Sequence, residues 1–120
     1  MEWGARYARE LKAGDTVLLH GEMGAGKTAL CKGIARGLGI RAEVTSPTYA
    51  YVNSYEDRLF HLDCYRVPSE EYAEALGLAE YFGTGVCLVE WSERIAGLLP
   101  ADCRHLYLVK RGETLREIHD

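Results

Sequence analysis

The stretch GEMGAGKT, residues 21–28, combines residue types and spacing that can bind phosphate. It matches the pattern G-x-x-x-x-G-K-[ST] through Gly21, Gly26, Lys27 and Thr28. In such a loop, successive backbone N–H groups point inward and the next helix adds its positive dipole end, so the turn binds an anion. Lys27 would contact the β- and γ-phosphates, and the Thr28 hydroxyl would bind Mg²⁺.

The expected nucleotide contacts of this loop come from consecutive residues. They are Met23, Gly24, Ala25, Gly26, Lys27 and Thr28. The alternative is a glycine turn that merely joins a strand to a helix. It accounts for Gly24 but leaves the pair Lys27 and Thr28 unexplained.

Two acidic residues at expected strand ends are candidates for holding the metal and orienting water, which a nucleotide hydrolase needs. Glu90 ends the apolar run VCLV, where a metal-binding acid belongs. Asp63 lies inside LFHLDCYR, and burying a carboxylate is costly unless it is paired or bound to metal. For Asp63 the alternatives are an ion pair with Arg66 or a cap for the next segment. For Glu90 the alternative is a solvated strand end.

The sequence also bears on which base would be bound. It contains no N/T-K-x-D segment and no glycine of a D-x-x-G motif, both typical of guanine-specific domains, so adenine is favoured. A small-molecule kinase would need an arginine-bearing lid and an acceptor pocket, for which 120 residues leave little chain. ATP hydrolysis or nucleotide-dependent switching is the simpler hypothesis. A small-molecule kinase and a non-catalytic nucleotide-gated adaptor remain the alternatives.

Alternating apolar runs and helical periodicities surround these residues. They predict helices over 2–12, 27–38 and 69–81, strands over 16–20, 59–65 and 85–91, extended chain over 44–57, and a hairpin of 105–110 with 113–119. Parallel neighbours need crossover connections, which helices supply. We therefore expect an α/β fold of the P-loop NTPase type, with a mostly parallel central sheet, antiparallel edge strands and three layers.

Composition limits the function classes. The chain is 48% hydrophobic and 27% charged, which fits one globular domain, and its net charge of −4 argues against bulk electrostatic binding of nucleic acid. No apolar run approaches the ~20 residues of a membrane span. Four separated cysteines without metal spacing favour reduced thiols and a cytoplasmic location.

Taken with these motifs, the chain resembles the TsaE (formerly YjeE) family, the ATPase component of bacterial tRNA threonylcarbamoyladenosine biosynthesis. The matching segments are GEMGAGKT, SPTYAYVNSY at 46–55, HLDCYR at 61–66 and CLVEW at 87–91, followed by Leu99 and Pro100. They occur in the order of the family and close to its spacing. SPTY and DxYR are not general features of P-loop proteins.

The resemblance implies a function that the residue patterns alone do not show. Members of the family hydrolyse ATP with Mg²⁺, weakly when alone, and act with the TsaD and TsaB proteins, which install the threonylcarbamoyl group on adenosine of tRNA. ATP turnover is thought to reset that complex between rounds rather than to transfer the group. Contact with tRNA would then be indirect.

The resemblance also implies roles for individual residues. Lys27 would be the phosphate lysine, Thr28 and Glu90 the magnesium contacts, and Asp63 the acid required for hydrolysis. Three further residues would lie near the nucleotide: Thr48 beside the γ-phosphate, Trp91 after the metal acid, and Gly112 near the base. For Trp91 a place in the core or at an interface is the equal alternative.

The chain departs from the family at its start. Members usually begin with an extra strand and a Thr or Ser that help to enclose adenine, whereas this chain starts almost on its first helix. We therefore expect one ATPase domain over residues 1–120 without the usual first strand.

The remaining polar and aromatic residues carry less chemistry. The four histidines alternate with apolar residues in expected strands and are expected to be structural; they are His20, His61, His105 and His119. Several tyrosines could pack the sheet or present a partner surface. These are Tyr49, Tyr51, Tyr55 and Tyr65.

Overall fold

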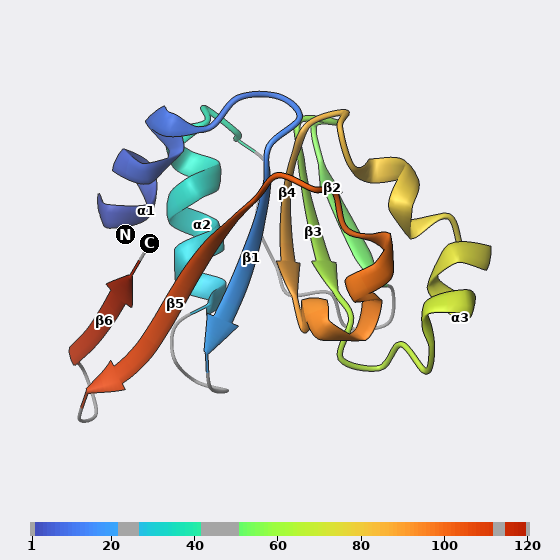
Figure 1. Ribbon diagram of the computed structural model, residues 1–120. Coiled ribbons are helices and arrows are strands. Elements are labelled where there is room, and N and C mark those ends of the chain that lie inside the picture. The colour runs from blue at the N-terminus through green and yellow to red at the C-terminus, as the bar shows by residue number, and fades with distance from the viewer. Residues whose placement is uncertain (1, 22–26, 42–50, 112–114, 120) are drawn as a thin grey trace.

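The computed structural model describes residues 2–21, 27–41, 51–111 and 115–119 of the chain. Within these ranges, six strands form one sheet in the order β2-β3-β4-β1-β5-β6 (Figure 1). Their bounds are β1 Thr16–Gly21, β2 Val52–Tyr55, β3 Leu59–Asp63, β4 Val86–Glu90, β5 Cys103–Arg111 and β6 Leu115–His119.

The sheet is parallel at its centre and antiparallel at both edges. β1 runs parallel to β4 and β5, and β3 runs parallel to β4, whereas β2 with β3 and β5 with β6 are antiparallel pairs. This arrangement confirms the predicted fold class, including the closing hairpin. The strand β1 is buried over four consecutive residues, as expected for a strand that is covered on both faces.

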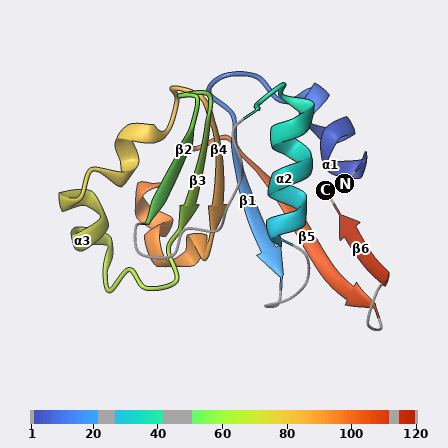
Figure 2. The same cartoon turned by 180° about the vertical axis from the view of Figure 1, so that it is seen from behind.

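Helices cover the two faces of this sheet (Figures 1 and 2). On one face lie α1, Glu2–Tyr7, its 3₁₀ continuation η1, Ala8–Glu10, and α2, Lys27–Gly37. On the other lie α3, Glu70–Ala75, and the 3₁₀ segments η2, Leu78–Tyr81, and η3, Ser92–Leu98. The result is the expected three-layer arrangement. None of the helices described here is long and apolar enough to cross a membrane.

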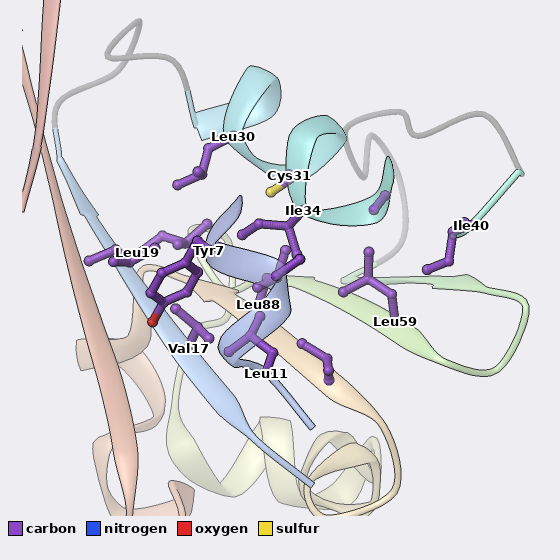
Figure 3. Packing of buried hydrophobic residues seen from close by; sticks show 14 of the residues in the cluster. Tyr7, Leu11, Val17, Leu19, Leu30, Cys31, Ile34, Ile40, Leu59 and Leu88 are labelled. Carbon is purple, nitrogen blue, oxygen red and sulfur yellow. The ribbon is translucent and has the colours of Figure 1, made fainter. Parts of the chain in front are cut away.

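Two apolar clusters hold the layers together. The cluster under α1 and α2 packs Leu30, Cys31 and Ile34 of α2 against β-strand residues such as Leu19 and Leu88 (Figure 3). The second cluster packs Leu18, Leu62, Val89 and other residues against α3 and the 3₁₀ segments. Because alternate residues of each strand point to opposite faces, both clusters fix the same central strands.

The prediction of one continuous helix over 69–81 is wrong, because α3 spans only Glu70–Ala75. Ser69 caps its start, since the Ser69 hydroxyl accepts a hydrogen bond of 3.1 Å from the Tyr72 N–H, but the helix ends at Ala75. Gly77 then adopts a φ of 77°, in the left-handed region where helices commonly terminate, and a separate 3₁₀ turn follows. The apolar periodicity continues across this break and conceals it in the sequence.

Strand polarity places the candidate functional residues at one edge of the sheet. β1, β3 and β4 are parallel, and their arrowheads in Figure 1 point to the same edge. β3 ends at Asp63 and β4 at Glu90, which are register partners, and β1 ends at Gly21. The predicted strands 59–65 and 85–91 thus end one or two residues earlier than expected, with their acids as the last residues.

The close packing of α1 on α2 depends on a glycine. A Cβ on Gly37 would lie 2.4 Å from the Ala5 carbonyl oxygen and 2.7 Å from the Ala8 Cβ, so backbone would have to move to make room.

We predict that Gly37→Ala lowers the free energy of unfolding by about 1–3 kcal/mol, the usual cost of overpacking. The measurement is the urea midpoint followed by circular dichroism. Lys32→Ala, an exposed change on the same helix, is the control and should stay within about 0.5 kcal/mol of the wild type. Equal midpoints for Gly37→Ala and the wild type would contradict this account of the packing.

Candidate functional site

Lys27 is the first residue of α2 and reaches back toward the ends of two strands. Its Nζ donates a hydrogen bond of 3.1 Å to the Gly21 carbonyl oxygen at the end of β1. The same Nζ lies 3.5 Å from the Oε1 of Glu90 at the end of β4. The Lys27 side chain is 10% exposed. The lysine therefore joins the start of a helix to the carboxyl edge of the sheet, where the phosphate loop is predicted.

Glu90 is bound through both of its carboxylate oxygens. Oε1 faces Lys27, and Oε2 lies 2.5 Å from the Nε2 of His61 on β3. The Glu90 side chain is 12% exposed, so the alternative of a solvated strand end is wrong. Two positively charged neighbours compensate for the burial of this carboxylate, which would otherwise be costly.

His61 is the more deeply buried partner, with a side chain 1% exposed. Its Nε2 also lies 3.8 Å from the Cys31 Sγ of α2, whereas its Nδ1 is buried without a hydrogen-bond partner. Burial favours the neutral imidazole, but the hydrogen bonds and charges of Cys31 and Glu90 outweigh it and raise the pKa of His61 to about 10. These contacts therefore favour the protonated form of the imidazole.

The same contacts act on Glu90 in the opposite direction. Burial favours the neutral acid, but the hydrogen bond and charge of His61, together with Lys27, hold the pKa of Glu90 below its usual value. These contacts thus favour the carboxylate form of Glu90, with Lys27 at one oxygen and His61 at the other.

Asp63 lies beside Glu90 in the register of β3 and β4. Its Oδ1 accepts a hydrogen bond of 3.1 Å from the backbone N–H of Tyr65, so it caps the segment that follows β3, one of the alternatives for this residue. The side chain is only partly buried and stands at the same edge as Lys27 and Glu90.

Trp91 is the residue that turns the chain away from β4. Its φ of 59° lies in the left-handed region, which is strained for a tryptophan. The Lys27 Nζ lies 5.5 Å from the centre of the Trp91 ring, at cation–π distance. The Tyr65 ring packs against the Trp91 ring, with 4.8 Å between the ring centres. A small pocket opens beside this contact, lined by Leu19, His20, Gly21, Lys27, Trp91 and Glu93.

Comparison with known proteins identifies the family of this chain. Residues 1–118 match the family described as threonylcarbamoyl adenosine biosynthesis protein TsaE. The chain belongs to the TsaE family.

Individual TsaE proteins are similar over most of the chain. The tRNA threonylcarbamoyladenosine biosynthesis protein TsaE of Bacillus subtilis is 46% identical over 111 residues, which cover 89% of this chain and 69% of that protein. Its counterpart in Treponema pallidum is also 46% identical, over 82% of this chain and 75% of its own length. The crystal structure of YdiB from Bacillus subtilis superposes with a TM-score of 0.74 at 39% identity, covering 96% of this chain and 72% of that one.

Within this TsaE fold, the predicted site residues fall into two groups. The structure brings Lys27, Glu90 and Trp91 together and sets Asp63 next to Glu90. The others lie outside the described residues or have side chains that are not described: Met23, Gly24, Ala25, Gly26, Thr28, Thr48 and Gly112. Their roles stay predictions.

The residue that sequence reasoning missed is His61. The sequence places it among the structural histidines, because its contact with Glu90 depends on the pairing of β3 with β4. A signal was available, because His61 and Asp63 are two apart in a strand and so point to the same face. A histidine at a buried strand position, on the same face as an expected catalytic acid, is a candidate to contact the acids of the site.

The contact between His61 and Glu90 predicts a pH dependence of stability. The pKa of His61 is about 10 in the folded chain against 6.5 ordinarily, so its contribution is complete below about pH 6.5 and lost as the pH rises toward 10. The difference in unfolding free energy between the wild type and His61→Gln should therefore shrink over that range, as measured by urea titration without nucleotide. His105→Gln, at an exposed histidine, is the control. A difference that stays constant from pH 6.5 to 10 would contradict the cationic state.

Proposed function

We propose that this chain is the Mg²⁺-dependent ATPase subunit required for threonylcarbamoyladenosine modification of tRNA, acting in the cytoplasm with the TsaD and TsaB proteins. The observation that carries the proposal is the contact between Lys27 and Glu90 where α2 begins beside the ends of β1 and β4. A lysine and a metal-binding acid meet at this position in P-loop NTPases. The role in tRNA modification is supported by the names of the TsaE relatives.

The described residues fit a magnesium–triphosphate group. Glu90 offers a carboxylate oxygen, the hard ligand that Mg²⁺ prefers, and α2 is an 11-residue helix whose positive end faces the site. The described part of the chain contains no cluster of three or more metal-ligating side chains. Mg²⁺ usually takes one or two protein oxygens and completes its shell with phosphates and water.

Each residue then has a role in binding or hydrolysis. Lys27 binds the β- and γ-phosphates, Thr28 and Glu90 hold Mg²⁺, and Asp63 orients the attacking water. The bound Mg²⁺ neutralises charge on the phosphates. Three residues complete the surroundings of the nucleotide: Thr48 beside the γ-phosphate, and Trp91 and Gly112 near the nucleotide.

We propose that the chain does not bind tRNA directly. The chain carries a net charge of −4, whereas proteins that bind nucleic acid through its phosphates usually present a basic face. Contact with tRNA is therefore through the complex. Hydrolysis by the isolated chain is weak and rises when TsaD and TsaB are present.

Removal of the lysine amine tests nucleotide binding. We expect Lys27→Ala to weaken ATP affinity roughly 10- to 100-fold, because charge-assisted hydrogen bonds to phosphate are lost. Affinity is measured by isothermal titration with Mg²⁺ present. Lys32→Ala removes an exposed lysine of the same helix and should bind like the wild type. Equal affinity of Lys27→Ala and the wild type would overturn the assignment of the loop.

Removal of the Asp63 charge tests hydrolysis separately from binding. Asp63→Asn should keep ATP affinity within about twofold, since it touches neither phosphate nor metal, and lose turnover by roughly 100-fold or more. Rates of phosphate release are compared with and without TsaD and TsaB. Stimulation of the wild type but not of Asp63→Asn supports the proposal. Phosphate transfer to an acceptor other than water would instead identify a kinase, and partner binding gated by ATP without turnover would identify an adaptor.

A further inference from the structure

We infer that His61 is a positioning residue that holds one oxygen of Glu90 in place and so leaves the other directed at the nucleotide. This inference rests on the proposed function, because it concerns the same ATP and Mg²⁺ site.

The two oxygens of Glu90 have partners that differ in distance and burial. Oε2 is bound by His61 at 2.5 Å, and His61 is 1% exposed. Oε1 faces Lys27 at 3.5 Å, a longer contact, and Lys27 also lines the pocket beside Trp91. One oxygen is therefore bound on the protein side and the other on the open side.

Neighbouring strands and a helix hold His61 in its position. It lies in the middle of β3, paired with Leu88 of β4 on one side and with Asn53 of β2 on the other. The Sγ of Cys31 in α2 lies 3.8 Å from the Nε2 of His61. The register sets His61 diagonal to Glu90, within reach across adjacent strands.

Lys27, in contrast, can exchange its partner. Its four-carbon side chain ends in a compact ammonium group that can rotate among acceptors, and in this structure it bonds the Gly21 carbonyl oxygen and faces Oε1 of Glu90. When phosphate oxygens take up the Lys27 ammonium, Glu90 loses that cation. His61 stays bound to Oε2, so the carboxylate keeps its orientation, and Oε1 is left free to face the metal ion.

Groups that hydrogen-bond a metal ligand generally affect the affinity of the site for the metal. A group that hydrogen-bonds a metal-binding carboxylate sets its orientation, and its loss costs roughly 10- to 100-fold in metal affinity. We therefore expect His61→Gln to raise the Mg²⁺ concentration that half-maximally promotes nucleotide binding by roughly 10- to 100-fold. This quantity is a binding measurement and does not depend on turnover.

The experiment titrates Mg²⁺ at a fixed concentration of fluorescently labelled ATP and follows fluorescence anisotropy. Four proteins form a double-mutant cycle: the wild type, His61→Gln, Glu90→Gln and the double variant. If His61 acts through Glu90, His61→Gln has its full effect on the wild type and less than about a twofold effect on Glu90→Gln. His105→Gln, the same replacement on the opposite face of the sheet, is the control and should match the wild type within about twofold.

Separate outcomes overturn the inference and the proposed function. Equal effects of His61→Gln in both backgrounds, or no effect in either, overturn the inference while Mg²⁺-dependent binding by the wild type leaves the proposed function standing. A wild type whose nucleotide binding ignores Mg²⁺ overturns the proposed function and the inference with it.

A second measurement needs no variant, in case His61→Gln does not fold. In the wild type, ¹⁵N nuclear magnetic resonance of the imidazole follows the hydrogen bond from His61 Nε2 to Glu90. This bond should persist when ATP and Mg²⁺ are added, with its proton resonance still far downfield. Loss of that resonance on nucleotide binding would show that His61 releases Glu90, and the inference would be wrong.

Discussion

The site depends on one constraint, the burial of the Glu90 carboxylate at the end of a parallel strand. A carboxylate that is only 12% exposed is costly unless positive groups lie against it. Lys27 supplies one from the start of α2, and His61 supplies the other from β3. Since neither partner is a sequence neighbour of Glu90, this ion cluster requires the strands and the helix to be in their native places.

The strand register of the sheet brings these residues together. β1, β3 and β4 are parallel neighbours, so their carboxyl ends meet at one edge, and α2 returns from that edge over the face that carries His61 and Glu90. The two apolar clusters on opposite faces clamp the same strands. Slippage of β3 by one residue is disfavoured, because it would turn His61 away from Glu90 and move buried apolar side chains to the other face.

In this structure the lysine that would bind phosphate is engaged with the protein itself. Lys27 bonds Gly21 and faces both Glu90 and the Trp91 ring. A triphosphate bound as proposed would compete with these contacts, and the contact of Glu90 with His61 would remain when the lysine leaves. The left-handed backbone of Trp91 adds a strained position directly after the acid, which is common where a site is held in one geometry.

The sequence by itself determined the class of fold, the phosphate-loop motif and the acids at strand ends, because these depend on local periodicity and on spacing within a few residues. Gly21, Lys27, Asp63 and Glu90 could all be named in advance for this reason. Only the tertiary structure decided that His61 is the partner of Glu90 and that the helix after Ser69 stops before Gly77. The first is a contact between different strands, set by register, and the second is a backbone conformation that the apolar pattern does not encode.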